Sequence, residues 1–420
     1  MPAPLQSSAG RQPDHTSGFT DAFSGSVSQA CDLTERGINP SSTSSRVPLT
    51  LLIATFANHG ASKVMGSSHL IYLGTYTHNR PSKGIYAVRL DHDTGALSSP
   101  ELVAEATDPA WITLSPDKRF LFAIHGSPTQ ARGFKIESGT GRLAPFPAKT
   151  SRGVTENVNP PSHLAVDASG RVLLAANYRD GFVASIPIGP DGTLGAARKV
   201  QHEGKGPHPT RQDKAHVHSV TASPDNRLVM VADLGLDRIY SYALDSSAAT
   251  LNAGNPPFVV TAPGAGPRHF KFGNDGRHGY VINELSNTIT TFDYEAARGV
   301  LTPKQTVSTL PLDFKAENIT AEVRVHPNGK FLYGSNRGHD SIAVYAIDPA
   351  SGELSRIEIV KSGGKTPRNF ALSPDGKWLV CGHQDTPLLT VFHVDAFTGR
   401  LARNSHTAEV PACVCVLFFD

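Results

Sequence analysis

The sequence predicts an all-β protein: a seven-bladed β-propeller in which each blade is a sheet of four strands. Three observations predict this fold. A polar turn recurs from residue 69 onward at intervals of roughly 50 residues, which is a spacing typical of propeller blades. Short segments rich in β-branched and aromatic residues follow each turn. The two ends of the repeating region each carry part of an incomplete blade, so that together they complete a ring.

The recurring turns define the repeat. They read SPDKR, DASGR, SPDNR, GNDGR, HPNGK and SPDGK, and they begin at residues 115, 167, 223, 273, 326 and 373. One apolar segment follows the turn, as in FLFAIH (120–125), and a second comes after it, as in IAVYAID (342–348). A glycine-containing turn such as PASGEL (349–354) then leads into a further strand. Each repeat therefore holds four antiparallel strands, ordered from the channel outward.

The ends of the repeat predict how the ring closes. HLIYLGTY (69–76) matches the second strand of a blade, but no first strand precedes it. PACVCVLF (411–418) matches a first strand, but nothing follows it. If the last strand joins the first blade, seven complete blades form and no sheet edge is left open at the closure.

Composition limits the possible functions. The 420 residues carry a formal net charge of +2, and the charges are spread evenly, so no basic surface indicates nucleic acid. The four cysteines (Cys31, Cys381, Cys413 and Cys415) are too few for a disulfide framework, and we expect reduced, buried thiols. We expect a monomer or weak dimer with no nucleic-acid or membrane partner.

Residues 1–68 differ from the rest because they are rich in Ser, Thr, Gly and Ala and lack strand alternation. We expect a disordered or targeting-like extension ahead of a propeller domain at 69–420. Within the extension, PLTLLIATFA (48–57) resembles the apolar part of a signal peptide, but it lies far from Met1 and is too short to span a bilayer. We expect a cytoplasmic protein, with export as the alternative if this run acts as a signal.

The strand order predicts where polar side chains gather. The start of each inner strand and the end of the next strand lie on one face of a propeller, beside the channel. Aligning the repeats places His218, Arg268 and Arg368 at a position where the other repeats carry alanine or serine. Arg337 and Glu284 both lie one position beyond the end of the second strand, in neighbouring repeats. These five side chains should therefore converge at one mouth of the channel.

Guanidinium groups gathered in a hollow suit a phosphate or a carboxylate, and a histidine beside them suits acid–base chemistry near neutral pH. By strand alternation, His269 should point away from Arg268 and act as a structural partner. His163 and Asn336 occupy neighbouring positions at the mouth and are candidate substrate ligands, although asparagines at such turns often serve the backbone instead. Tyrosines and phenylalanines of the third strands should be core residues.

Several motifs together resemble the propeller-type 6-phosphogluconolactonases, a lactonase family that includes the fungal 3-carboxy-cis,cis-muconate lactonizing enzymes. They are YLGTYT, KGIYAVRLD, PPSHLAVDASGRVLLAANY, VQHEGKGP, AHVHSV, VADLGLDRIYSY, GAGPRHFKF, VINELSNTIT, SNRGHDSIAVY and TPRNFALSPDGKWLV. The likeness runs from about residue 69 to 418. It implies hydrolysis of 6-phospho-D-glucono-1,5-lactone to 6-phosphogluconate in the pentose phosphate pathway, without a metal.

The resemblance also implies a catalytic set. The cluster proposed in the muconate relatives falls on His218, Arg268, Glu284 and Arg337. In this hypothesis His218 or Glu284 takes a proton from the attacking water, while Arg268 and Arg337 stabilise the oxyanion or hold the phosphate. Arg368, His163 and Asn336 complete the expected substrate-binding set.

No cofactor and no metal are expected. His208, His216 and His218 lie close in the sequence and could suggest zinc, but the repeat places no third ligand of another type beside them. Two alternatives to the lactonase stay open: a lactonizing cycloisomerase acting on a muconate-type dicarboxylate, and a non-catalytic propeller that binds a ligand at its mouth. The segment 300–320 is expected to arch over the mouth and limit substrate size.

Overall fold

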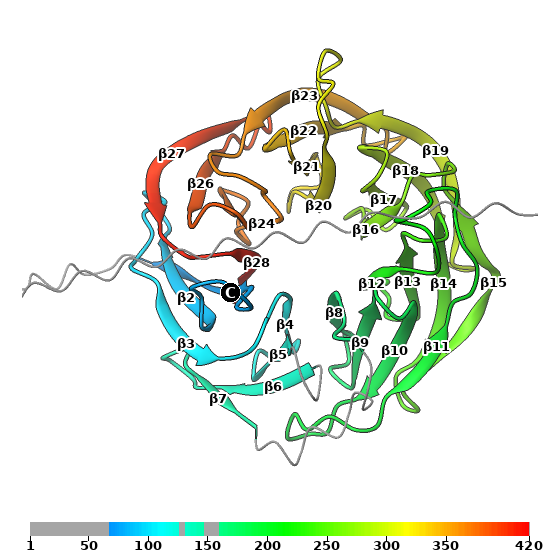
Figure 1. Ribbon diagram of the computed structural model, residues 1–420, viewed down its shortest axis with the longest axis horizontal. Helices are drawn as coiled ribbons and strands as arrows, with labels where there is room; N and C mark the ends of the chain where they lie inside the picture. Colours follow the sequence, from blue (N-terminus) through cyan, green and yellow to red (C-terminus); the bar gives the residue numbers. More distant parts are fainter. Residues whose placement is uncertain (1–66, 126–130, 147–158, 420) are drawn as a thin grey trace, which may run out of the picture. The chain divides into compact units, whose positions relative to one another are not determined.

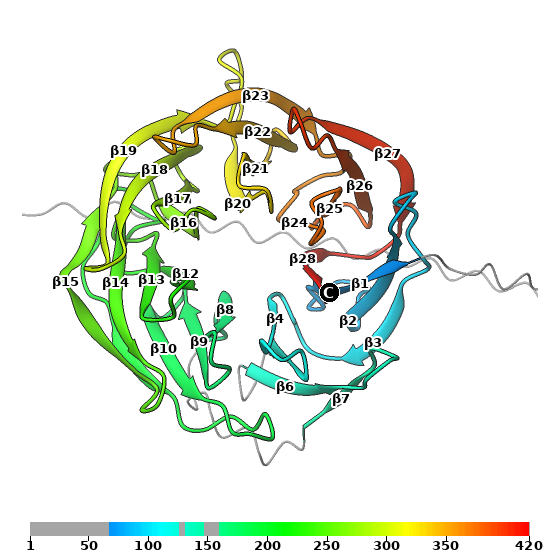
Figure 2. The same ribbon diagram turned by 180° about the vertical axis from the view of Figure 1, so that it is seen from behind.

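The computed structural model describes residues 67–125, 131–146 and 159–419. The predicted N-terminal extension at 1–68 therefore lies outside the described residues, except for its last two residues. The apolar run at 48–57 also lies outside them. The described part contains seven four-stranded antiparallel sheets. They are arranged in a ring around a central axis, as Figures 1 and 2 show from the two sides. No helix in this part could span a membrane.

The strands fall into four concentric sets. The innermost are β4 (Ile112–Leu114), β8 (His163–Val166), β12 (Val217–Ala222), β16 (Pro267–Phe272), β20 (Ile319–Val325), β24 (Asn369–Leu372) and β28 (Cys413–Phe418). The second are β5 (Phe120–Ile124), β9 (Val172–Asn177), β13 (Leu228–Asp233), β17 (His278–Asn283), β21 (Phe331–Arg337), β25 (Trp378–Gly382) and β1 (Ser68–Thr75). The third are β6 (Ala131–Ile136), β10 (Phe182–Pro187), β14 (Arg238–Asp245), β18 (Thr288–Glu295), β22 (Ser341–Ile347), β26 (Leu389–Val394) and β2 (Gly84–Asp91). The outermost are β7 (Leu143–Pro145), β11 (Arg198–Gln201), β15 (Thr250–Val260), β19 (Val300–Ser308), β23 (Leu354–Lys361), β27 (Leu401–Ala408) and β3 (Glu101–Glu105).

Ring closure occurs as predicted. β28 pairs antiparallel with β1, so that the last strand is the innermost strand of the first blade. In the register of this pair, Leu73 lies opposite Val416 and Gly74 opposite Cys415. Cys413 and Cys415 are free and buried, as is Cys381. The prediction of a seven-bladed propeller closed by the C-terminal strand is confirmed.

Apolar side chains from facing sheets pack between the blades. The second strands contribute most, because strands such as β5 and β25 are buried along their whole length. Their tyrosines also form polar contacts between blades. The hydroxyls of Tyr72, Tyr280 and Tyr333 donate hydrogen bonds to the carbonyl oxygens of Gly141, Gly352 and Gly399, at 2.6, 3.0 and 2.9 Å. Each acceptor lies in the turn between the third and outermost strands of the next blade, so the bond joins consecutive blades.

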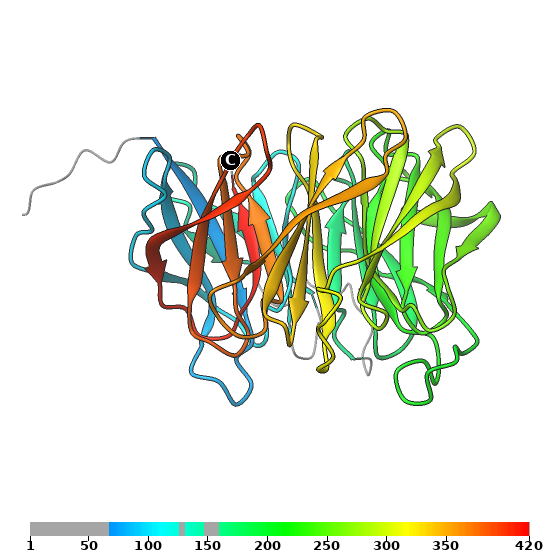
Figure 3. The same ribbon diagram turned by 90° about the horizontal axis from the view of Figure 1, so that it is seen from above.

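All strands run between two faces, with the turns at either end (Figure 3). We call the site face the one at which the innermost strands begin and the second strands end; the loop after β1, drawn in blue, projects from it at the bottom of Figure 3. The segment 300–320 does not arch over the channel. Its first part is the outer strand β19, and the yellow segment between β19 and β20 extends outward past β23 in both views of the ring. That expectation was wrong because the first half of the segment is fully used in pairing with β18.

Candidate active site

A cavity of about 590 Å³ opens at the centre of the site face. Its walls come from the starts of the innermost strands and the ends of the second strands. The aromatic and charged residues lining it include Tyr76, Trp111, Tyr178, Arg179, Arg211, His218, Arg268, His269, Glu284, Arg337 and Arg368. A larger hollow of about 800 Å³ lies among the turns at the other ends of the strands and is bordered by residues such as Asp117, Arg119 and Ser169. We place the candidate site in the smaller cavity because its charged groups are buried and converge.

β-Bulges aim the site residues into this cavity. In β12 the pairing with β13 skips His218, and in β16 the pairing with β17 skips Arg268. A bulged residue leaves the strict alternation of a strand and re-aims its side chain. As a result Arg268 and His269 both border the cavity. The expectation that His269 points away from Arg268 was therefore wrong, since that expectation assumed an unbroken strand.

Glu284 is the centre of the charged cluster. Its side chain is 4% exposed, and its Oε2 lies 2.8 Å from Nε of Arg268 and 2.9 Å from Nη2 of Arg337. Arg211 binds the other carboxylate oxygen, Oε1. Nε2 of His218 lies 3.8 Å from Oε2. The four residues predicted as catalytic (His218, Arg268, Glu284 and Arg337) are thus brought together by the fold.

The arginines determine the charge of Glu284. Burial alone would raise the pKa of this carboxyl, but Arg337 and Arg268, followed by His218 and Arg211, hold its pKa well below the usual range. Glu284 is therefore a carboxylate at neutral pH and has little tendency to take a proton. A carboxylate in this state is suited to fix the guanidinium groups rather than to serve as a base.

Arg268 and Arg337 are each bound a second time by the backbone. Nη1 of Arg268 donates to the carbonyl oxygen of Ala321, and Nη2 of Arg337 donates to that of Thr320, both at 2.6 Å. Both acceptors lie on β20, so Arg268 is anchored to the next blade, whereas Arg337 on β21 is anchored within its own blade. These hydrogen bonds fix the orientation of both guanidinium groups before any ligand arrives. A site that stabilises a developing negative charge needs donors that are preorganised in this way.

Three buried histidines lie around the cluster. The ring centroid of His269 lies 5.3 Å from that of His163 and 5.3 Å from that of His218. Burial lowers the pKa of each of the three well below the usual value, and in His218 the charge of Arg268 adds to this effect. All three rings are therefore neutral at pH 7. His269 also contacts Glu322, whose Oε2 lies 3.1 Å from its Nδ1.

Two predicted substrate ligands lie outside the cavity wall. The ring of His163 packs against Trp111, with centroids 4.1 Å apart, and this histidine lies behind the lining residues. The amide of Asn336 is fully buried and is used locally: Oδ1 accepts from Oγ1 of Thr309, and Nδ2 donates to the carbonyl oxygen of Thr309 and to Oγ of Ser341. Asn336 thus plays the backbone-serving role that asparagines often have at such turns.

Arg368 does border the cavity and is half-buried, with its guanidinium 5.6 Å from the centroid of the Tyr76 ring. Arg211 was missed by the sequence analysis. It lies in the loop between β11 and β12, where the repeats have no common pattern, and it reaches Tyr178 as well as Glu284. No alignment of blades could have identified it, because its position has no counterpart in the other repeats.

His208 and His216, considered with His218 as a zinc site, serve other roles. Nδ1 of His216 lies 2.8 Å from the carbonyl oxygen of Tyr178, and its Nε2 lies 3.0 Å from Asp213. His208 accepts at Nδ1 from backbone amides of its own turn. Within residues 67–125, 131–146 and 159–419, no group of three metal-ligating side chains lies in this cavity.

Comparison with known proteins agrees with this geometry. The family described as "Lactonase, 7-bladed beta-propeller" matches residues 70–418. A 6-phosphogluconolactonase of Bacillus subtilis is 36% identical over 355 residues, which cover 84% of this chain and 99% of the relative. A 6-phosphogluconolactonase of Formosa agariphila is 30% identical, with 79% and 94% covered. The solved structure of a periplasmic gluconolactonase of Pseudomonas aeruginosa superposes with a TM-score of 0.78 at 32% identity, covering 84% of this chain and 99% of that chain. The chain belongs to the lactonase family of seven-bladed β-propellers.

Proposed function

We propose that this protein is an enzyme that hydrolyses 6-phospho-D-glucono-1,5-lactone to 6-phosphogluconate. The observation that carries the proposal is the buried Glu284 carboxylate, which holds Arg268, Arg337 and Arg211 at the wall of an open cavity beside a neutral histidine. Such a cavity offers fixed positive charge and a proton acceptor, which are the two requirements of water attack on an ester carbonyl. The names of the relatives from Bacillus subtilis and Formosa agariphila support the same substrate.

His218 is the base in this mechanism. It is neutral at pH 7 and borders the cavity, whereas both carboxylate oxygens of Glu284 are already bound by guanidinium groups. His218 takes a proton from water as the water oxygen attacks the lactone carbonyl carbon. The resulting oxyanion lies against Arg268 and Arg337. The bond from carbon to the ring oxygen then breaks, and His218 returns the proton to that oxygen, which leaves an acid and an alcohol.

The phosphate is held nearer the rim. Arg268 and Arg337 are 3% and 8% exposed at their side chains, and Glu284 and the backbone hold them deep in the cavity. Arg211 is 33% exposed, and Arg368 is half-buried, so both can contact an entering group. Guanidinium groups bind phosphate oxygens in pairs. We therefore assign phosphate binding to Arg211 and Arg368, which lie on the same cavity.

The catalytic part of the chain in this proposal is the propeller, 69–420, acting as a monomer or weak dimer without nucleic-acid or membrane partners. We place it in the cytoplasm, where the pentose phosphate pathway operates. The periplasmic gluconolactonase among the similar structures makes export the alternative.

Coupled assays test the proposal. The lactone is generated in situ, its opening is followed with 6-phosphogluconate dehydrogenase, and the spontaneous rate is subtracted. We expect wild type to accelerate the reaction, and Glu284→Gln and Arg268→Ala each to reduce kcat/KM by about 100-fold. Glu295→Gln and Arg277→Ala, which alter exposed residues of the outer surface, are matched controls and should keep full activity. If the folded wild-type protein does not accelerate the reaction, the proposal is wrong.

Unphosphorylated glucono-1,5-lactone is the second candidate substrate, favoured by the gluconolactonase structure. The two candidates differ at the rim. If the phosphorylated lactone is the substrate, Arg368→Ala should raise KM about tenfold for that lactone and leave KM for glucono-1,5-lactone unchanged. If Arg368→Ala leaves both KM values unchanged, Arg368 does not bind phosphate and the assignment is wrong.

A further inference from the structure

Three side chains with the chemistry of metal ligands meet where the ring closes. His69 lies near the start of β1, His92 follows the end of β2, and Asp375 lies in the turn between β24 and β25. The first two belong to the first blade and the third to the last blade. The group lies at the ends of the strands opposite the site face, away from the cavity that holds Glu284.

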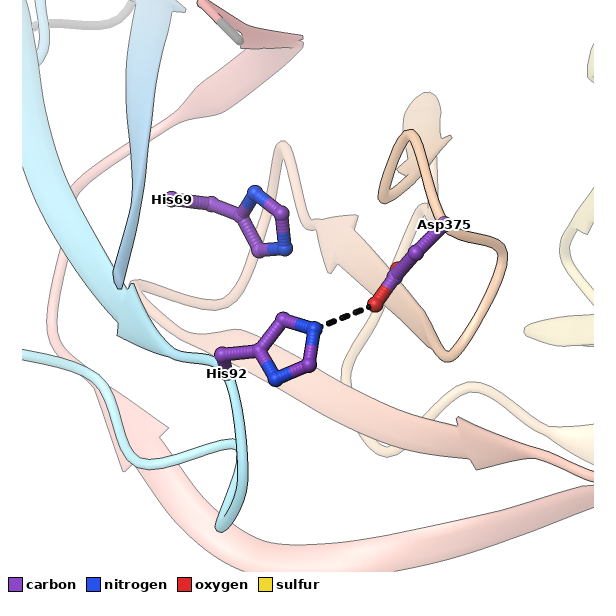
Figure 4. A group of neighbouring side chains, drawn as sticks. All are labelled: His69, His92 and Asp375. Carbon is purple, nitrogen blue, oxygen red and sulfur yellow. Dashed lines mark ion pairs between the residues drawn. The ribbon is translucent and has the colours of Figure 1, made fainter. Parts of the chain in front are cut away.

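The three side chains can offer one ligand atom each, and these atoms lie within 4.8 Å of one another. Nε2 of His92 is 2.9 Å from Oδ2 of Asp375, and the two imidazole centroids are 5.6 Å apart. Figure 4 shows both rings turned toward the space in front of the carboxylate. Within the described ranges, no other group of three His, Cys, Asp or Glu residues converges in this way.

Neighbouring groups orient the possible ligands. Oδ1 of Asp375 accepts hydrogen bonds from Oγ of Ser373 and from the amide of Lys377, at 2.5 and 3.1 Å, which leaves Oδ2 turned to His92. Nε1 of Trp378 donates to the carbonyl oxygen of His92 at 2.9 Å, and this bond ties the His92 turn to the last blade. Outer partners of this kind fix ligands in metal sites.

The surroundings would admit an ion. The side chains of His92 and Asp375 are 37% and 33% exposed, so an ion could enter from solvent and keep water as a further ligand. A second carboxylate, that of Asp93, lies 3.3 Å from Nδ1 of His92 and adds negative charge. Lys377 lies beside this group, and its Nζ is 3.8 Å from Oδ1 of Asp93. The local charge therefore favours a cation.

We propose that His69, His92 and Asp375 bind a divalent transition-metal ion, with zinc as the first candidate, and that this ion links the first blade to the last. Two imidazoles and one carboxylate with room for water are a donor set suited to Zn²⁺ or Co²⁺, whereas Mg²⁺ prefers oxygen ligands alone. An ion held in this way binds the folded ring and not the unfolded chain, so it stabilises the closure. The proposal does not depend on the reaction proposed above.

Thermal unfolding of the full-length protein tests this site. The protein is first freed of metal with a chelator, and its Tm is measured with added ZnCl₂, CoCl₂ or MgCl₂. We expect Zn²⁺ at about a hundredfold excess over its Kd to raise Tm by about 3–4 °C, and Mg²⁺ to leave Tm unchanged. Bound Co²⁺ should also give visible absorption bands, which zinc should abolish by competition.

His92→Gln and His69→Gln should each lose the Tm rise and the cobalt spectrum, while His406→Gln, which alters an exposed histidine outside the group, should keep both. Each variant is compared with itself with and without metal, so a change in basal stability does not affect the result. Lactone hydrolysis should be the same in His92→Gln and wild type. A Tm that zinc does not raise, or raises equally in wild type and His92→Gln, overturns the proposal.

Discussion

Glu284 shows how a single residue organises this site. The carboxylate is buried, and three guanidinium groups from different parts of the ring converge on it. Sequence comparison among the blades identified His218, Arg268 and Arg368 as unusual for their position, because the other repeats carry alanine or serine there. The same comparison found Glu284 only as a counter-charge. It could not find Arg211, because a loop residue outside the repeat has no equivalent positions in the other blades with which to compare it.

The buried histidines predict how stability depends on pH. His163, His218 and His269 have pKa values well below 6.5 in the folded state, because burial disfavours the charged ring. The unfolded chain therefore binds more protons below about pH 6.5, and folding loses free energy as the pH falls. We expect the free energy of unfolding to decrease between about pH 6.5 and 5 with a slope approaching 1.4 kcal/mol per pH unit for each histidine.

Urea unfolding at a series of pH values measures that slope. His163→Phe, at a residue behind the cavity wall, should reduce the slope by the share of one histidine. A free energy of unfolding that stays constant from pH 7 to 5.5 would contradict the neutral state assigned to these rings.

At the scale of single elements, the strands could be predicted from the sequence and the bulges could not. The turn motif located the strands on either side of it, because an innermost strand ends before the turn and the second strand begins after it. The bulges at His218 and Arg268 carry no sequence signal of their own, because they depend on the register between two strands. This is why the side on which His269 lies was predicted incorrectly.

The tyrosine contacts between blades give a prediction at this scale. Tyr333→Phe removes the hydroxyl that donates to the carbonyl oxygen of Gly399 and leaves that buried acceptor without its partner. We expect the free energy of unfolding to fall by about 1–2 kcal/mol, as measured by urea unfolding. Tyr86→Phe is the matched control, because its hydroxyl accepts one exposed hydrogen bond within its own blade and its loss should have little effect. Equal losses in the two variants would show that the contact between blades adds no stability.

At the scale of the whole propeller, the ring could be predicted almost completely. The turn motif gave the number of blades, and the unmatched strands at the two ends gave the closure, because a closed ring must account for every strand. The depth and charge of the cavity could not be obtained in this way, since they depend on side chains from several blades meeting in space.

Closure also predicts the effect of a truncation. Deleting residues 411–420 removes β28, which exposes the inner edge of β1 and opens one side of the channel wall. We expect the truncated chain to aggregate and to melt at lower temperature, as measured by size-exclusion chromatography and thermal unfolding. Addition of a peptide containing residues 409–420 should partly restore the wild-type Tm, because it can pair with the free edge. A truncated chain that stays monomeric with an unchanged Tm would show that closure is not needed for stability.

The pairing of β1 with β28 has a consequence for how the protein is made. The inner edge of residues 71–75 finds its partner only at 413–418, so the first blade to leave the ribosome is the last to be completed. During synthesis its second strand remains an unpaired edge while the other six blades are added. Translation speed and chaperone binding to this early edge should therefore affect the yield of native protein more than any event in the middle of the chain.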